Sequence, residues 1–226
     1  GFGVWQVPDD QAQVATEEAL RVGYRLLDTA AVYRNESGVG RAIAAAGVPR
    51  EELFVTTKLA IADQGFSNAQ TAGKASLERL ALDYVDLYLI HWPVAPMERV
   101  LQTWSALIEL RERGLVRSIG VSNFLPEHLE RLRRETDVVP AVNQVEVHPA
   151  FQNAEVVAAS VAAGIAVEAY SPIGQGASLT SDTVRRIAEE HGVTPAQVVL
   201  RWHVQLGALP PADGEAGTLS YNVVEK

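Results

Sequence analysis

The chain alternates between short apolar segments and amphipathic segments along most of its length, and this alternation limits its fold more than any other feature. The apolar segments predict seven strands, at residues 1–7, 25–28, 53–58, 85–91, 118–122, 141–146 and 166–170. Apolar residues at helical spacing fill the intervals between these strands. Such alternation indicates a parallel sheet, because neighbouring parallel strands must be joined by crossover helices.

Two architectures fit a parallel sheet of this size, a closed barrel and an open doubly wound sheet. The nucleotide-binding open sheet usually carries G-x-G-x-x-G after its first strand. The glycine pairs at positions 1/3, 38/40 and 174/176 each lack the third glycine. We therefore predict an α/β fold of the (β/α)8 TIM-barrel type over residues 1–207. No eighth strand is evident after Leu206, so residues 208–226 are expected to form an atypical tail of the same domain or to be disordered.

Composition excludes several classes of protein. The 226 residues contain 19 Lys and Arg against 28 Asp and Glu, a net charge of −9, which argues against nucleic-acid binding because phosphate contacts need a basic face. Cysteine is absent, so disulfides, iron–sulfur clusters and thiolate zinc sites are excluded, and no metal site is expected. No apolar run is long enough to cross a membrane, and a monomeric cytoplasmic protein is expected.

Polar side chains gather where the predicted strands end. Asp28, Lys58 and His91 each end a predicted strand, and Tyr33 follows the first of them in a loop. In a barrel the carboxyl ends of the strands form the catalytic face, so these four side chains should meet on one rim. Asp28 would hold Lys58 as an ion pair, and the ammonium would lower the pKa of the Tyr33 phenol so that it gives a proton near neutral pH.

Each of these residues also has a structural explanation when it is taken alone. Lys58 suits a lysine whose charge reaches solvent at a barrel rim, and Asp28 suits a turn. Tyr33 suits a half-buried loop aromatic, and His91 suits a core histidine. Together the four supply a proton donor, a cation, an anion and a neutral hydrogen-bond donor, a set that is suited to protonating a carbonyl oxygen.

The chain resembles an aldo-keto reductase. Its overall sequence pattern is most similar to that of the bacterial branch that includes diketogluconate reductases. The motifs that carry the resemblance stand in family order: Asp28-Thr29-Ala30 with Tyr33 and Asn35-Glu36, Thr57-Lys58, Asp86-Leu87-Tyr88 with His91-Trp92-Pro93, Gly120-Val121-Ser122-Asn123-Phe124, Asn143-Gln144 with His148-Pro149, and Tyr170-Ser171-Pro172. The resemblance implies a (β/α)8 barrel that binds NADPH across its C-terminal face.

The resemblance also implies roles for individual residues. It implies a catalytic tetrad of Asp28, Tyr33, Lys58 and His91, with Tyr33 as the general acid. It implies that the cofactor is bound by Ser122, Asn123 and Gln144 at the nicotinamide carboxamide, by Tyr170 stacked on the ring and by Ser171 near the pyrophosphate. It implies a substrate pocket lined by Trp5, Ala60 and Trp92.

The chain departs from the family pattern in three ways. It lacks the N-terminal hairpin, and Ala60 stands where the family commonly has Trp, which predicts a more open pocket. No Lys or Arg occurs between Arg201 and Lys226, so the basic residues that usually bind the 2′-phosphate of NADPH are not found there. NADH is therefore an alternative cofactor. We expect one of two outcomes: the apolar run at 219–224 takes the place of the eighth strand, or residues are missing from the sequence near 207–217.

These observations predict an NAD(P)H-dependent reductase of small aldehydes and ketones, with keto sugars or dicarbonyls among the candidates. Two alternatives stay open. One is a barrel lyase or aldolase in which Lys58 forms a Schiff base with a carbonyl substrate. The other is a barrel that binds nucleotide but is catalytically weak.

Overall fold

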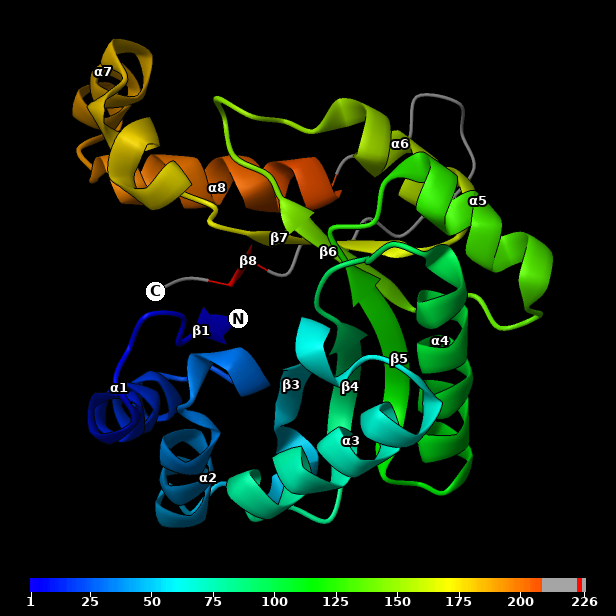
Figure 1. The fold of residues 1–226 in the computed structure, drawn as a ribbon. Helices are drawn as coiled ribbons and strands as arrows, with labels where there is room; N and C mark the ends of the chain where they lie inside the picture. The colour runs from blue at the N-terminus through cyan, green and yellow to red at the C-terminus, as the bar shows by residue number, and fades with distance from the viewer. Residues whose placement is uncertain (209–222, 225–226) are drawn as a thin grey trace.

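The computed structural model describes residues 1–208 and 223–224, and it contains one curved sheet of eight parallel strands in sequence order (Figure 1). The strands are β1 (Phe2–Gly3), β2 (Leu26–Asp28), β3 (Phe54–Leu59), β4 (Val85–Ile90), β5 (Val116–Ser122), β6 (Val142–Glu146), β7 (Ala166–Tyr170) and β8 (Val223–Val224). Each strand pairs in parallel with the next. The predicted barrel class is confirmed.

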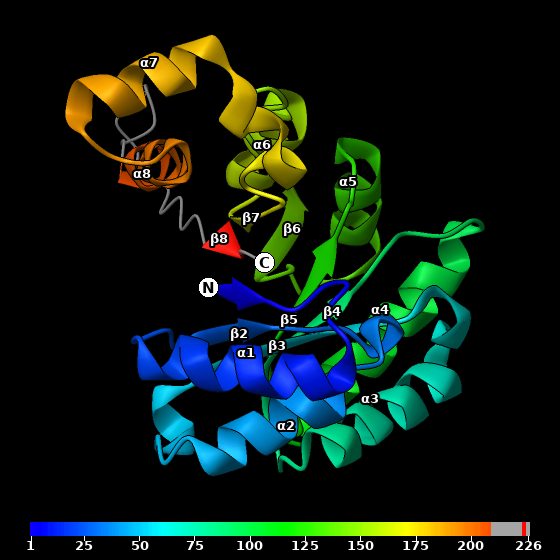
Figure 2. The same ribbon diagram turned by 90° about the vertical axis from the view of Figure 1, so that its left-hand side faces the viewer.

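Helices cover the outer face of the sheet, as the alternation predicts (Figures 1 and 2). They are α1 (Asp9–Arg21), α2 (Glu36–Ala45), α3 (Phe66–Leu80), α4 (Met97–Glu112), α5 (Pro126–Glu135), α6 (Ala154–Ala162), α7 (Asp182–His191) and α8 (Pro195–Ala208). Pro126 and Pro195 begin α5 and α8, where the missing N–H of proline leaves no intrahelical hydrogen bond unmade. No helix in the described part of the chain is long and apolar enough to cross a bilayer.

The first strand is much shorter than the predicted segment at residues 1–7. The chain leaves the sheet after Gly3, and the Val7 N–H donates to the Val4 carbonyl at 3.1 Å. Gln6 has a positive φ of 61°, which is incompatible with an extended strand. The turn directs Trp5 towards the end of the barrel at which the strands finish.

Two residues of the apolar run at 219–224 occupy the position of the eighth strand. Val223 and Val224 pair in parallel with Ala169 and Tyr170 of β7. β8 also lies close to β1, so it stands between β7 and β1 (Figure 2). The rest of that run, residues 219–222, lies outside the described residues, as does most of the segment 207–217.

The apolar core lies mainly between the sheet and the helices. All six residues of β4 are buried, as expected for a strand with both faces covered. Trp104 of α4 is fully buried, and its indole N–H donates to the Val138 carbonyl at 3.2 Å. Gly40 lets α2 approach α3 closely, because a Cβ at this position would lie 2.3 Å from the carbonyl oxygen of Leu80. The barrel interior, by contrast, holds a group of charged and amide side chains.

Candidate active site

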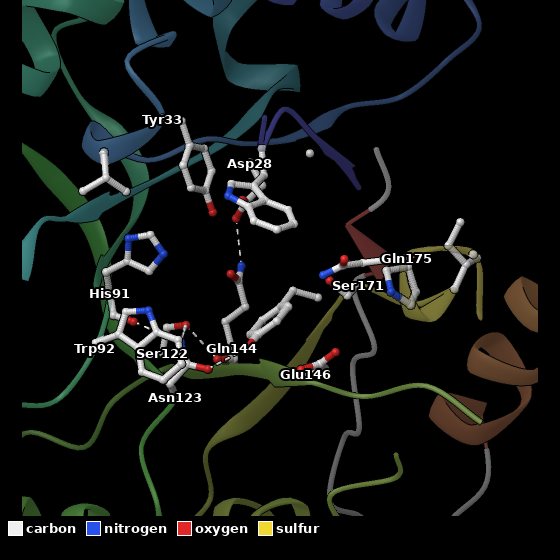
Figure 3. A pocket seen from close by; sticks show the side chains of 17 residues that line it. Asp28, Tyr33, His91, Trp92, Ser122, Asn123, Gln144, Glu146, Ser171 and Gln175 are labelled. Carbon is white, nitrogen blue, oxygen red and sulfur yellow. Dashed lines mark hydrogen bonds between the residues drawn. The ribbon is translucent and has the colours of Figure 1, made fainter. Parts of the chain in front are cut away.

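A cavity of about 810 Å³ opens at the carboxyl ends of the strands (Figure 3). Ten of the twelve predicted site residues line it, namely Trp5, Asp28, Tyr33, His91, Trp92, Ser122, Asn123, Gln144, Tyr170 and Ser171. They come from the ends of six strands and from the loops that follow. The two predicted residues that do not line the cavity are Lys58 and Ala60.

Lys58 lies beneath the cavity floor, at the buried end of β3. Its side chain is 1% exposed and forms an ion pair with Asp28 Oδ1. Its Nζ also donates to the backbone oxygen of Thr29 at 3.0 Å. Burial alone would lower the pKa of Lys58, but the negative charge of Asp28 and the other acidic groups nearby raise it above its usual value. The lysine is therefore a cation with a fixed position, which differs from a flexible lysine at a rim.

Tyr33 lies above this ion pair, in the single turn of 3₁₀ helix at Ala31–Tyr33 that follows β2. Lys58 Nζ lies 5.2 Å from the centre of the Tyr33 ring. Burial raises the pKa of the phenol, and the Lys58 charge opposes this only in part, so the net pKa is higher than usual. The expectation that Lys58 would bring the phenol pKa down towards neutrality is wrong, because the cost of burying a phenolate exceeds the attraction of the cation.

His91 completes the group of four. It directly follows β4, and its ring meets the Tyr33 ring edge-on, with the centroids 5.7 Å apart and the planes at 76°. Burial and the nearby Lys58 charge lower the pKa of His91 to about 3. At neutral pH the imidazole is therefore uncharged, and it can donate one hydrogen bond without carrying a positive charge.

A second group of side chains lies at the ends of β5, β6 and β7. Asn123 Nδ2 donates to the His91 carbonyl at 3.1 Å and to Ser122 Oγ at 3.0 Å, while its Oδ1 accepts a 2.9 Å hydrogen bond from the Tyr170 hydroxyl. Ser122 Oγ donates to the Gln144 backbone oxygen at 2.8 Å. These contacts fix the Tyr170 ring in one orientation on the cavity wall. Ser171 follows with a positive φ of 48° and begins the next loop.

Gln144 links this second group to the first. Its Nε2 donates to Asp28 Oδ2 at 2.8 Å, the contact drawn in Figure 3, and to Glu168 Oε1 at 3.0 Å. Glu168 was not among the predicted site residues. The signal was present in the sequence, because the inward face of a barrel strand normally carries apolar residues and Glu168 is ionisable.

The two tryptophans and Ala60 occupy different places. Trp5 and Trp92 are 39% and 44% exposed and line the mouth of the cavity. Ala60 is buried directly after β3 and is not part of the cavity wall. Within the described part of the chain, no three His, Asp or Glu residues are grouped so as to hold a metal ion.

A parallel barrel with acid–base groups gathered at the carboxyl ends of its strands has the layout of a TIM-barrel enzyme. The model of the aldo/keto reductase family matches residues 1–218. An aldo-keto reductase of Mycolicibacterium smegmatis is 53% identical over 207 residues, which are 92% of this chain and 75% of that protein.

Solved structures agree with this assignment. A variant of Gox0644 in complex with NADPH is 41% identical, with a TM-score of 0.89 over 100% of this chain and 77% of that one. A putative 2,5-diketo-D-gluconic acid reductase B is 34% identical, with a TM-score of 0.88 over 100% of this chain and 76% of that one. The chain belongs to the aldo/keto reductase family, and the predicted oxidoreductase class is confirmed.

Proposed function

We propose that this protein reduces small aldehydes and ketones with NADPH as the hydride donor and Tyr33 as the general acid. The observation that carries the proposal is the meeting of Asp28, Tyr33 and His91 at one cavity, with Lys58 ion-paired to Asp28 beneath it, although the chain supplies them from separate strand ends. The similar Gox0644 variant was solved with NADPH, which supports the choice of cofactor.

The cavity offers the chemistry that a nicotinamide group requires. A carboxamide needs both donors and acceptors, and Gln144 points its Nε2 at two carboxyl groups, so that Oε1 is the atom left for a ligand. Among the described residues no hydrogen bond to Gln144 Oε1 is present. Ser122 and Asn123 would stand beside the carboxamide, Tyr170 would pack against the ring, and Ser171 would lie near the pyrophosphate. Bound there, NADPH would supply a hydride to the carbonyl carbon.

Tyr33 supplies the proton that balances this reduction. Its raised pKa keeps the phenol protonated at neutral pH, and its O–H would donate to the carbonyl oxygen as negative charge develops there. The tyrosinate that remains would be stabilised by the Lys58 cation. Asp28 holds that cation in place through their ion pair.

His91 would orient the substrate. Its pKa of about 3 makes it a neutral imidazole, which can hydrogen-bond to the carbonyl oxygen without competing with Tyr33 as the proton donor. Trp5 and Trp92 at the mouth of the cavity would contact the rest of the substrate. Ala60 lies outside the wall, so its part in an open pocket remains a prediction.

The alternative in which Lys58 forms a Schiff base fits the geometry less well. A nucleophilic lysine needs a depressed pKa and access to substrate. Lys58 is 1% exposed, it is ion-paired with Asp28, and its pKa is raised. These three properties favour a structural cation that acts on Tyr33.

NADPH titration followed by nucleotide fluorescence, and NADPH oxidation with a panel of small aldehydes, ketones, keto sugars and dicarbonyls, test the proposal together. We expect saturable binding and turnover of at least one carbonyl class. Binding without turnover on any of these substrates would favour the catalytically weak barrel, and absence of binding would refute the proposal. The same titration with NADH tests the cofactor preference, which we expect to be small because no Lys or Arg occurs between Arg201 and Lys226. A monomeric state also stays a prediction, which sedimentation can test.

A further inference from the structure

Glu168 is a buried carboxyl group that the mechanism above does not use. It stands in the middle of β7, with 1% of its surface exposed, directly opposite Gln144 in the β6–β7 ladder. Both side chains point into the barrel interior, and Gln144 also lines the cavity above. A carboxyl group at this place needs a physical explanation, because burying a charge is costly unless it is fully paired.

Among the described residues, the side-chain hydrogen bond to Glu168 comes from Gln144. One N–H of the Gln144 amide reaches Asp28 Oδ2 at 2.8 Å, and the other reaches Glu168 Oε1 at 3.0 Å. Asp28 continues the chain of contacts to Lys58 through Oδ1. With both N–H groups used in this way, the amide can present only its Oε1 to the cavity.

Burial, together with the Asp28 charge, favours a neutral Glu168. The described side chains that face it are Asp28 from β2, Lys58 from β3 and Gln144 from β6. Burial and the Asp28 charge raise the pKa of Glu168 to about 8, against the opposing effects of Lys58 and Gln144. Among the described residues, no hydrogen-bond partner reaches Glu168 Oε2, which fits a protonated carboxyl better than a carboxylate.

We propose that Glu168 is a positioning residue whose carboxyl group is protonated and uncharged. It fixes the orientation of the Gln144 amide, and it adds no second negative charge beside the Asp28–Lys58 ion pair beneath Tyr33. This inference rests on the proposed function, because it describes how the same site is held ready. When Glu168 loses its proton to solvent, a second negative charge enters the interior. That charge strengthens the hold of Lys58 on its proton and opposes ionisation of the Tyr33 phenol, so proton donation weakens.

The direction of the pH effect follows. Below about pH 8 Glu168 is neutral and the site is active, and above it the ionised fraction grows. The rate constant kcat/KM for carbonyl reduction should therefore fall by about tenfold between pH 7 and pH 9. Tyr33 itself does not cause this decline, because its pKa lies above the usual tyrosine value.

Glu168→Gln tests the titration, because glutamine keeps an oxygen that can accept from Gln144 and cannot ionise. We expect this variant to lose the decline, so that its kcat/KM changes by less than about twofold between pH 7 and pH 9. Glu36→Gln is the matched control. Glu36 is also 1% exposed, but it accepts hydrogen bonds from Thr57 and Arg79, outside the cavity. The control should keep the decline of the wild type.

Glu168→Leu tests the positioning, because it removes one acceptor and leaves the Gln144 amide held by Asp28 alone. We expect the Kd for NADPH, measured by fluorescence, to rise about three- to tenfold. Because this variant could fail to fold, infrared spectra of the wild-type protein without cofactor provide an independent measurement. A protonated carboxyl band should be present at pH 6, disappear with an apparent pKa near 8, and be missing from Glu168→Gln.

The proposal is overturned if the infrared band is absent at pH 6, or if Glu168→Gln keeps the alkaline decline. An unchanged NADPH affinity in folded Glu168→Leu would overturn the positioning role. The infrared titration needs neither cofactor nor substrate. If the protein reduced no carbonyl but the infrared band titrated as expected, the proposed function would be refuted. The inference that Glu168 is protonated near neutral pH would still be supported.

Discussion

Replacing Tyr33 with phenylalanine tests the assignment of the general acid most directly. The substitution removes the phenol oxygen and keeps the ring, which meets the His91 ring edge-on at 5.7 Å and lies near Lys58. The half-buried hydroxyl contributes little to folding, so the free energy of unfolding should change by no more than about 1 kcal/mol.

The expected loss of activity follows from what remains in the site. A positioned general acid typically contributes about 10²–10⁴-fold. His91 cannot replace the lost donor, because its pKa of about 3 keeps it neutral and a neutral imidazole is a weak acid. Lys58 is held by Asp28 beneath the cavity. We therefore expect a decrease in kcat/KM of about 10³–10⁴-fold, equivalent to a barrier higher by about 4–5 kcal/mol.

The assay compares kcat/KM for a small aldehyde with the Kd for NADPH in the same variant. Among the described residues, Tyr33 forms no hydrogen bond with Ser122, Asn123 or Gln144, the proposed partners of the carboxamide, so the Kd should stay within about twofold. Tyr24→Phe is the matched control. Tyr24 meets Phe2 edge-on at 5.9 Å and does not line the cavity, so both constants should be unchanged.

Two results would refute this reasoning. Activity of Tyr33→Phe within tenfold of the wild type would show that another group donates the proton. A Kd for NADPH that rose as much as kcat fell would show that the substitution disturbs the site as a whole.

Three further predictions concern the same framework. Between about pH 5 and pH 7, kcat/KM for reduction should be constant, because His91 is already neutral and Tyr33 still protonated; an acid limb near pH 6.5 would show that His91 titrates there. Lys58→Met should abolish reduction and destabilise the fold by about 3–5 kcal/mol in urea unfolding, because it leaves Asp28 buried without its cation, and adding Asp28→Asn should restore stability but not activity. Gly40→Ala should destabilise the fold by about 1–3 kcal/mol in the same experiment, because its Cβ would lie 2.3 Å from a backbone oxygen of α3, and an unchanged midpoint would show that α2 moves freely.

The sequence was sufficient to predict the barrel and most of the candidate site. The alternation of strands and helices is a local property that can be read at each interval, and parallel strands place their carboxyl ends on one face. For that reason Asp28, Tyr33 and His91 could be assigned to one rim before any contact was known, and the structure brings them to one cavity. The family motifs added the residues at the ends of β5, β6 and β7.

Other properties depended on which distant segments meet. The pKa of Tyr33 moves upwards because the fold buries the phenol more strongly than Lys58 attracts its anion, a balance that sequence spacing does not contain. Ala60 follows the same strand as Lys58, yet it is buried and does not line the cavity. The place of Glu168 in the site could be recognised only from the structure, in which Gln144 donates hydrogen bonds to both Glu168 and Asp28. Asp28 and Gln144 are 116 positions apart in the chain. The sequence determined which strand ends meet on one face of the barrel, since that follows from local periodicity, whereas the protonation states of the groups there were decided by the tertiary structure, because burial and charge act through space.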